Sequence, residues 1–313
     1  MHTGLKAGIF AVALAATFGT AYGVGAAVGP AAAPAPAAHA GHAPGPNGRA
    51  AAPETPGGLQ VSQGGYTLDL KTPAVTAGTP AELRFAVRDD RTGRPVTAYR
   101  PEHGKELHLI VASRDLAVFR HLHPRRAADG TWSVPADLPA AGGYRVFADF
   151  TPEGAEDGLT LGADLAVTGA YRPAGLPAPA ATAETDGYRV TLDGALRPGA
   201  PSALTLRVTK DGKPVTDLQP YLGAYGHLVA LRSGDLAYLH VHPGGAAGDG
   251  RRSAGPAVSF TAIAPSVGTY RLFLDFRHQG AVHTAAFTVR TAGAAPADGP
   301  REGADGAADG HHH

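Results

Sequence analysis

The chain has 313 residues, enough for two domains of ordinary size, and its 27 basic residues balance its 27 acidic ones. A net charge of zero gives no indication of a nucleic-acid partner or of an anionic membrane surface. The absence of cysteine and the single methionine exclude disulfides, thiol catalysis, cysteine-ligated metals and a methionine-rich copper(I) site. Fifteen histidines remain as abundant metal ligands, and the 43 glycines and 27 prolines favour a turn-rich β protein.

The N-terminal segment predicts export. Lys6 precedes an uncharged stretch, residues 7–28, that is rich in alanine and glycine and just long enough to span a bilayer. We therefore predict a signal anchor or transmembrane helix over residues 1–29, which would hold the protein in the cell membrane by a single span with its bulk outside the cytoplasm. The alternative is a cleaved signal peptide and a secreted protein, since residues 38–40 resemble a cleavage site.

The rest of the chain divides into two similar units joined by linkers. Residues 30–58 and 171–185 are rich in alanine and proline and are expected to be linkers, and residues 292–313 are expected to be a disordered tail. Between them, residues 59–170 and 186–291 carry the same motifs in the same order, among them GRPVT and GKPVT, then YRVFADF and YRLFLDF. We interpret this pattern as a tandem duplication.

Each unit consists of short alternating or apolar runs separated by turn residues, without a sustained helical period. In the first unit the runs are residues 66–70, 82–88, 107–112, 116–123, 131–134, 144–150 and 160–167, and the second unit has seven runs at the matching places. About seven strands in about 100 residues is typical of an immunoglobulin-like sandwich. Tyr144 and Tyr270 begin a late strand, as the tyrosine of a tyrosine corner does. The predicted fold class is therefore all-β, with two tandem immunoglobulin-like β-sandwich domains after the N-terminal helix.

One histidine arrangement occurs in both units. A first histidine is followed thirteen residues later by an H-x-H-P motif, and an apolar run, a polar turn and a second apolar run lie between them, which predicts a β-hairpin. The residues concerned are His108, His121 and His123 in the first unit and His227, His240 and His242 in the second.

The expected turns set the register of each hairpin. Two-residue turns at 114–115 and 233–234 place the first histidine of each unit directly opposite the first histidine of the H-x-H motif. Opposed Cβ atoms lie about 5 Å apart and alternate residues share a face, so three imidazoles should converge in each unit. Three imidazoles are ordinary ligands for Cu(II) or Zn(II). The sequence thus predicts two such metal sites, and the alternative for these histidines is a packed or hydrogen-bonded role without metal.

Neighbouring residues could belong to the same sites. Glu106, opposite His123 in the expected register, is a candidate carboxylate ligand. Asp149 and Asp275 lie in apolar strands, where they either orient a ligating histidine or occupy a solvated edge position or pair with an arginine. His278 and His283 flank a turn of the second unit and either add ligands there or lie at the surface.

These motifs resemble those of a group of exported actinobacterial proteins that carry HLHP-type and HLVALRxGDLAYLHVHP-type sequences. The resemblance covers both units, through residues 108–124 and 227–243 and the Tyr-Arg-x-Phe-x-Asp-Phe strands. Such proteins look like heavy-metal or copper-handling accessory proteins, and the resemblance implies no catalytic residues. A likeness to bicupins is only partial, because Ala246 and Ala247 stand where the cupin motif has a glutamate.

The sequence therefore predicts an exported, membrane-tethered protein that binds Cu(II) or Zn(II) for sequestration or delivery and is not an enzyme. Its expected partners are the metal ion, the membrane through the N-terminal anchor, and an envelope protein, with no nucleic acid. The alternative is a structural or adhesive tandem immunoglobulin-like protein of the cell surface without metal. A cupin-like metalloenzyme is a third, less favoured hypothesis, because the glutamate of the cupin motif is absent.

Overall fold

The computed structural model describes residues 55–239, 241–244 and 254–291. The predicted signal anchor, most of the 30–58 linker and the 292–313 tail lie outside these residues. Within the described part of the chain, no helix is sufficiently long and apolar to cross a membrane.

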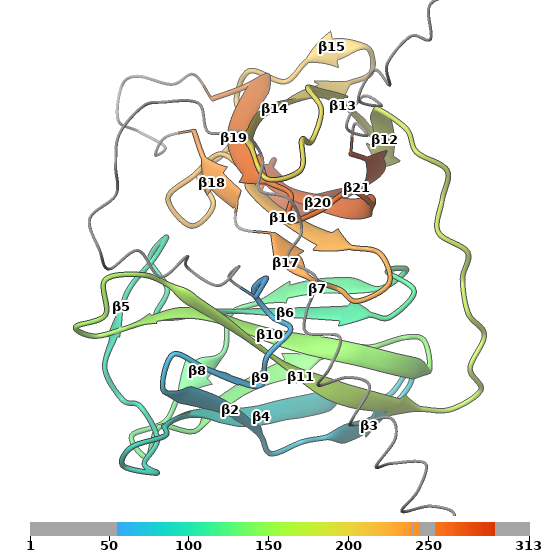
Figure 1. The fold of residues 1–313 in the computed structure, drawn as a ribbon. Coiled ribbons are helices and arrows are strands. Elements are labelled where there is room, and N and C mark those ends of the chain that lie inside the picture. The colour runs from blue at the N-terminus through green and yellow to red at the C-terminus, as the bar shows by residue number, and fades with distance from the viewer. Residues whose placement is uncertain (1–54, 240, 245–253, 292–313) are drawn as a thin grey trace, which may run out of the picture. The chain divides into compact units, whose positions relative to one another are not determined.

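The regular elements of the described residues are β-strands, in agreement with the predicted all-β class (Figure 1). The strands of the first repeat are β1 (Ser62–Gln63), β2 (Tyr66–Leu70), β3 (Ala74–Thr76), β4 (Ala81–Asp89), β5 (Tyr99–Arg100), β6 (Leu107–Ser113), β7 (Phe119–Leu122), β8 (Arg125–Arg126), β9 (Trp132–Ala136), β10 (Gly142–Pro152) and β11 (Leu159–Thr168). Those of the second repeat are β12 (Thr182–Thr185), β13 (Tyr188–Asp193), β14 (Pro201–Lys210), β15 (Lys213–Pro214), β16 (His227–Arg232), β17 (Tyr238–Leu239), β18 (Val241–Pro243), β19 (Ala257–Ile263), β20 (Thr269–His278) and β21 (Ala281–Arg290).

Each repeat is a sandwich of two sheets. In the first repeat the sheet orders are β1-β2-β4-β9-β8 and β3-β11-β10-β6-β7, with β5 beside β10. In the second repeat they are β12-β13-β14-β19-β18, with β15 beside β14, and β17-β16-β20-β21. Apart from β3, which runs parallel to β11, the strand pairs are antiparallel, and each sandwich has its own apolar core. This confirms the prediction of two tandem immunoglobulin-like sandwiches.

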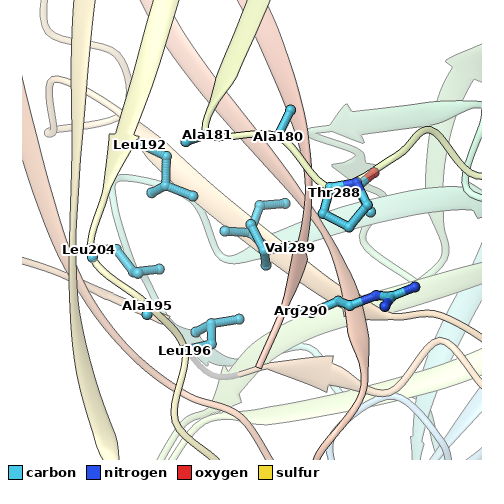
Figure 2. Close-up of a pocket in the computed structure, with 12 residues that line it drawn as sticks. Ala180, Ala181, Leu192, Ala195, Leu196, Leu204, Thr288, Val289 and Arg290 are labelled. Carbon is cyan, nitrogen blue, oxygen red and sulfur yellow. The ribbon is translucent and has the colours of Figure 1, made fainter. Parts of the chain in front are cut away.

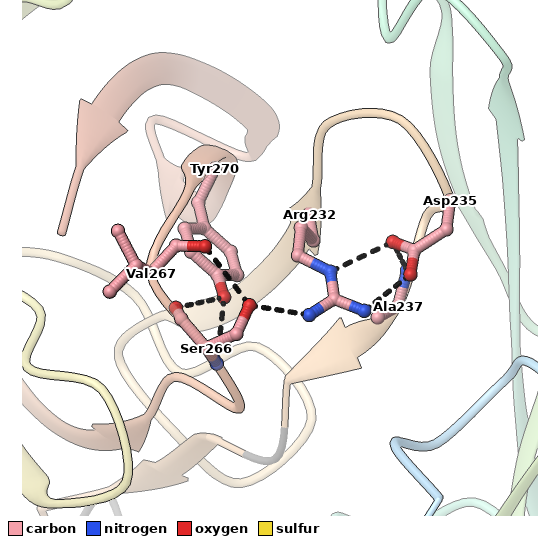
Figure 3. A network of polar contacts seen from close by, with 6 residues as sticks. All are labelled: Arg232, Asp235, Ala237, Ser266, Val267 and Tyr270. Atoms are coloured by element: carbon pink, nitrogen blue, oxygen red, sulfur yellow. Dashed lines mark hydrogen bonds and ion pairs between the residues drawn. The ribbon is translucent and has the colours of Figure 1, made fainter.

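Both predicted tyrosine corners are present. The Tyr144 hydroxyl donates to the Ala140 carbonyl oxygen at 2.7 Å, and the Tyr270 hydroxyl donates to that of Ser266 at 2.8 Å. Figure 3 shows the second corner, where the Ser266 hydroxyl also accepts a hydrogen bond from Arg232. The same link four residues back along the chain in each repeat reflects the duplication of the sequence.

The two repeats pack against each other through an apolar cluster of their own. Phe119 of the first repeat stacks on Phe273 of the second, with ring centres 4.0 Å apart, and Phe147 meets Tyr238 at 5.7 Å. Phe147 and Phe273 occupy the same position of the repeated YRxFxDF motif. The equivalent sheets of the two sandwiches therefore face each other, each contributing an aromatic pair.

The chain enters the first repeat earlier than its composition suggests. Gly57 and Gly58 belong to the stretch expected to be linker, yet Gly57 accepts a hydrogen bond from the backbone of Tyr238 at 2.9 Å, and Gly58 donates to Thr160 at 2.8 Å. This segment therefore touches both repeats. Likewise, β12 lies within residues 171–185, so the second sandwich begins before the end of the expected linker.

The second repeat contains a cavity of about 270 Å³ whose lining differs chemically from the histidine motif (Figure 2). Leu192, Leu196 and Val289 border it, and Arg290 lies at its side. Its described lining contains no histidine or carboxylate, so it offers no ligands to a metal ion.

Candidate metal centre

The three first-repeat histidines predicted as ligands lie together. His108 is on β6, His121 is on β7, and His123 follows the end of β7. One ring nitrogen from each residue lies within 4.8 Å of those of the other two. The three ring centres are separated by 4.9, 5.2 and 5.3 Å.

The hairpin that carries these residues has a different register from the expected one. Ile110, and not His108, lies opposite His121, and the second hairpin shows the same two-residue shift, with Ala230 opposite Leu239. The predicted pairing was therefore wrong by two positions. Because this shift is an even number of residues, His108 and His121 keep their predicted faces of the sheet.

The shift arises in the turns. They span residues 114–117 and 233–236, and each contains a leucine with a left-handed backbone, Leu116 at φ 58° and Leu236 at φ 63°. Both leucines are almost fully buried in the apolar cluster between the repeats. A two-residue turn would not place a side chain there, so contact with the other repeat selects the wider turn.

A tight turn fixes the orientation of His108. Residues 102–105 form a two-residue turn with positive φ at His103 and Gly104, and the Glu102 carbonyl oxygen lies 3.1 Å from Nε2 of His108. A carbonyl oxygen only accepts hydrogen bonds, so Nε2 carries the proton of the neutral ring and Nδ1 presents a lone pair. The sequence signal was the His103-Gly104 dipeptide, whose relation to the motif was missed.

A carboxylate of the second repeat orients His121. Nδ1 of His121 lies 2.8 Å from Oδ2 of Asp275, whose other oxygen accepts a hydrogen bond from Thr284 at 2.6 Å. Both the His121 and Asp275 side chains are buried. Of the two roles open to Asp275 from the sequence, the structure therefore gives it contact with a histidine of the cluster. Since Nδ1 donates to the carboxylate, Nε2 of His121 has its lone pair free.

The free nitrogens of these two rings face each other. Nδ1 of His108 lies 3.1 Å from Nε2 of His121. If both rings are neutral and oriented by Glu102 and Asp275 as described, two lone pairs meet at this distance. Such an arrangement is stable only with a proton or a cation between the two nitrogens.

His123 adds an unsatisfied nitrogen. Its Nε2 is buried and has no hydrogen-bond partner among the described residues. Burial, together with the nearby His121, lowers the pKa of His123 to about 4, and burial lowers the pKa of His108 to about 3. Both rings are therefore neutral at physiological pH, which is the form that binds metal.

A fourth and a fifth imidazole approach the cluster. His227, from the second repeat, has its ring centre 6.0 Å from that of His121 and 6.4 Å from that of His108. His103 lies on its other side, with ring centres 5.1 Å apart. The sequence assigned His227 to a separate site, because local register cannot show that the two hairpins face each other.

The rest of the second predicted site is not described. His240 and the side chain of His242 lie outside the described residues. A second three-histidine cluster formed by His227, His240 and His242 therefore stays a prediction.

Three further candidates from the sequence have other partners. Glu106 forms a bidentate ion pair with Arg126, at 3.0 and 3.1 Å. His278 is buried, rather than a surface residue, and both His278 and His283 are hydrogen-bonded to aspartates of the second repeat. These contacts account for them without a metal ion.

A cavity of about 310 Å³ borders the cluster. Its lining includes four histidines of the two repeats and four carboxylates, together with Arg100 and apolar side chains such as Val229 and Phe260. The histidines and carboxylates are His103, His108, His121, His227, Glu102, Asp149, Glu156 and Asp157. Carboxylates around such an opening raise the local concentration of cations.

One family model matches both repeats. It is described as "Domain of unknown function (DUF8832)" and matches residues 60–165 and 183–293. A comparison with curated proteins finds no match.

Solved structures of low similarity include an adhesin and other bacterial proteins. FdeC, an adhesin of Escherichia coli, is 16% identical over 74% of this chain and 65% of its own, with a TM-score of 0.25. InvD of Yersinia pseudotuberculosis is 12% identical over 74% and 58%, with a TM-score of 0.24. Salmonella alpha-2-macroglobulin is 14% identical over 77% and 15%, with a TM-score of 0.26. The chain spans less than two thirds of each of these proteins, and likeness at this level carries no information on function.

Proposed function

This chain belongs to the DUF8832 family, and we propose that it binds one divalent transition-metal ion, Cu(II) or Zn(II), through His108, His121 and His123. The observation that carries the proposal is the convergence of three ring nitrogens within 4.8 Å of one another. Two of these rings are oriented by a carbonyl and a carboxylate, and the third has a buried nitrogen without a partner. Orientation of ligating histidines by such groups is typical of metal centres.

The spacing of the rings fits an ion. With metal–nitrogen bonds of about 2.0–2.1 Å, tetrahedral ligand nitrogens lie about 3.3 Å apart and imidazole ring centres about 5.2 Å apart. The His108 and His121 nitrogens are already 3.1 Å apart, and the three ring centres are separated by 4.9–5.3 Å. Only a small adjustment of His123 is needed for all three to reach one ion.

We further propose that this binding serves sequestration or delivery of the ion outside the cytoplasm. Two features support this role: the sequence of the N-terminal segment and the carboxylate-lined cavity beside the histidines. The membrane, through that segment, and an envelope protein are the partners that this role requires.

A structural or adhesive protein without metal is the second candidate. The observation in its favour is the apolar contact between the repeats, which joins them without any ion. In this case the histidines act as a buried polar cluster, and their replacement would change stability but not partner binding.

Titration with Cu(II) and Zn(II) separates the two candidates. Because the terminal histidines 311–313 bind metal weakly on their own, the chain is truncated after Gly310. We expect about one ion per chain with a Kd below about 1 µM, and a loss of at least about tenfold in His123→Ala. His283→Ala, a histidine with its own aspartate, is the matched control and should bind as the parent does. Failure of the parent to bind, or equal binding by His123→Ala, would reject the metal site.

A further inference from the structure

We infer that the metal centre belongs to both repeats: Asp275 of the second repeat positions His121, and His227 of the second repeat supplies a fourth imidazole. This inference rests on the proposed function and adds to it that a bound ion fastens the two sandwiches together. The predicted alternative was a complete and separate site within each repeat.

The contact of Asp275 with His121 crosses between the repeats. Asp275 is 3% exposed, and its two oxygens are held by His121 at 2.8 Å and Thr284 at 2.6 Å. A carboxylate fixed in this way keeps the His121 ring in one tautomer and one orientation. The first repeat alone therefore lacks the group that points Nε2 of His121 toward the other ligands.

His227 is prepared for metal binding in the same way as His108. Its Nε2 lies 2.7 Å from the carbonyl oxygen of Tyr221, which belongs to a tight turn equivalent to the one at Glu102. Nε2 thus carries the ring proton and Nδ1 presents a lone pair.

The distances place His227 just outside the group of three. Its ring centre is 6.0 and 6.4 Å from those of His121 and His108, which exceeds the spacing of about 5.2 Å expected around a tetrahedral ion by about 1 Å. Tetrahedral sites with four protein ligands are usual for structural zinc, whereas three ligands leave an open position. Closure of this last gap would draw β16 toward the first repeat.

His103 is the competing source of a fourth ligand. It is exposed, it lies in the first repeat, and its ring centre is 6.2 Å from that of His108. The counterpart of His103 in the second repeat is Leu222, which has the same positive φ, whereas the counterpart of His227 in the first repeat is a histidine, His108. A site completed by His103 would hold the ion without joining the repeats.

Cu(II) bound to the full chain provides the test, by electron paramagnetic resonance and competitive titration at a ratio of one ion per chain. The wild type should show four coordinated nitrogens. We expect three nitrogens and a tenfold to hundredfold weaker affinity in His227→Asn, and a loss of similar size in Asp275→Asn. His103→Asn tests the competing ligand, and if His227 completes the site this variant should keep four coordinated nitrogens. The matched controls are His283→Asn and Asp186→Asn, whose side chains form a hydrogen-bonded pair of their own and which should leave both readouts unchanged.

The outcomes are distinct. A wild type that binds no copper overturns the proposed function and this inference together. A wild type that binds tightly with three nitrogens overturns this inference alone, and that result needs no variant to fold. Loss of a nitrogen in His103→Asn, with His227→Asn unaffected, assigns the fourth ligand to the first repeat and also overturns it.

Discussion

Arg145 and Arg271 occupy the same position in the two repeats but have different surroundings. Arg145 donates hydrogen bonds to the carbonyl oxygens of Gly58, Leu59 and Gly162, at 2.6 to 3.1 Å. Arg271 donates to Thr288, and its Nε is buried without a partner among the described residues.

The residues opposite Phe147 and Phe273 show the same difference. Gly162 lies opposite Phe147 in the first repeat, and Ala286 lies opposite Phe273 in the second. A Cβ on Gly162 would stand 2.0 Å from the Gly58 oxygen, so residues 57–59 require a glycine beneath them. Both repeats thus have the same sandwich. They differ in that a covering segment, made of Gly57, Gly58 and Leu59, lies over Gly162 in the first repeat.

The largest expected effect tests what the repeats share. Phe147→Ala and Phe273→Ala each remove a buried ring from the cluster between the sandwiches, and each should lower the free energy of unfolding by about 3–5 kcal/mol. Urea denaturation measures both, with Val267→Ala, at a side chain that is 61% exposed, as the control. If only one of the two substitutions lowers the free energy of unfolding, the two repeats do not contribute equally to the contact.

Replacement of Arg145 and Arg271 tests how the surroundings of this position differ between the two repeats. Arg145→Met leaves buried carbonyl oxygens without their donor and should cost about 2–3 kcal/mol. Arg271→Met also removes an unsatisfied Nε, and burial already lowers the pKa of this guanidinium, so the change should stay within about 1 kcal/mol. Equal losses in the two variants would contradict the role assigned to residues 57–59.

Gly162 and Ala286, which lie opposite the two phenylalanines, provide a second test of how the repeats differ. Gly162→Ala should destabilise the protein by about 1–3 kcal/mol, because the new methyl group displaces the covering segment. Ala286→Gly should cost about 1 kcal/mol, from the freer unfolded chain and a lost methyl contact. The measurement is again urea denaturation, combined with hydrogen exchange at Gly58. Unchanged protection of the Gly58 amide in Gly162→Ala would show that the segment is not held there.

The pattern of the sequence predicted the strands because alternation of apolar and polar residues reflects burial on one face. The runs at 66–70 and 107–112 match β2 and β6 closely, and both tyrosine corners are where the late strands begin. The grouping of His108, His121 and His123 followed from the same period of two. These are properties that a strand and its neighbours along the chain determine together.

What the sequence left open depends on contacts between the repeats. The turn register was missed because Leu116 and Leu236 are buried against the opposite sandwich, which no hairpin rule includes. The choice between the two roles of Asp275 stayed open for the same reason, since its histidine partner is 154 positions away. Gly57 and Gly58 have the composition of a linker, and their close approach to the first repeat depends on the absence of a side chain at Gly162.

A further expected effect concerns acid and separates the contributions of the two repeats. Burial holds the pKa of His108, His123 and His227 at about 3, 4 and 4, below the value of about 6.5 expected in the unfolded chain. Between about pH 6.5 and pH 4 the unfolded chain therefore binds protons that the folded chain does not bind. The free energy of unfolding thus falls as the pH falls.

Each of these rings contributes at most about 1.4 kcal/mol for every pH unit in that window, two of them in the first repeat and one in the second. His227→Asn should therefore reduce the slope of stability against pH by about a third, and an asparagine amide can still donate to the Tyr221 carbonyl oxygen. Urea denaturation at pH 7, 6 and 5 with a chelator present measures this slope for the metal-free protein. Stability that stays constant from pH 7 to pH 5 would mean that these rings accept protons in the folded state as readily as in the unfolded chain.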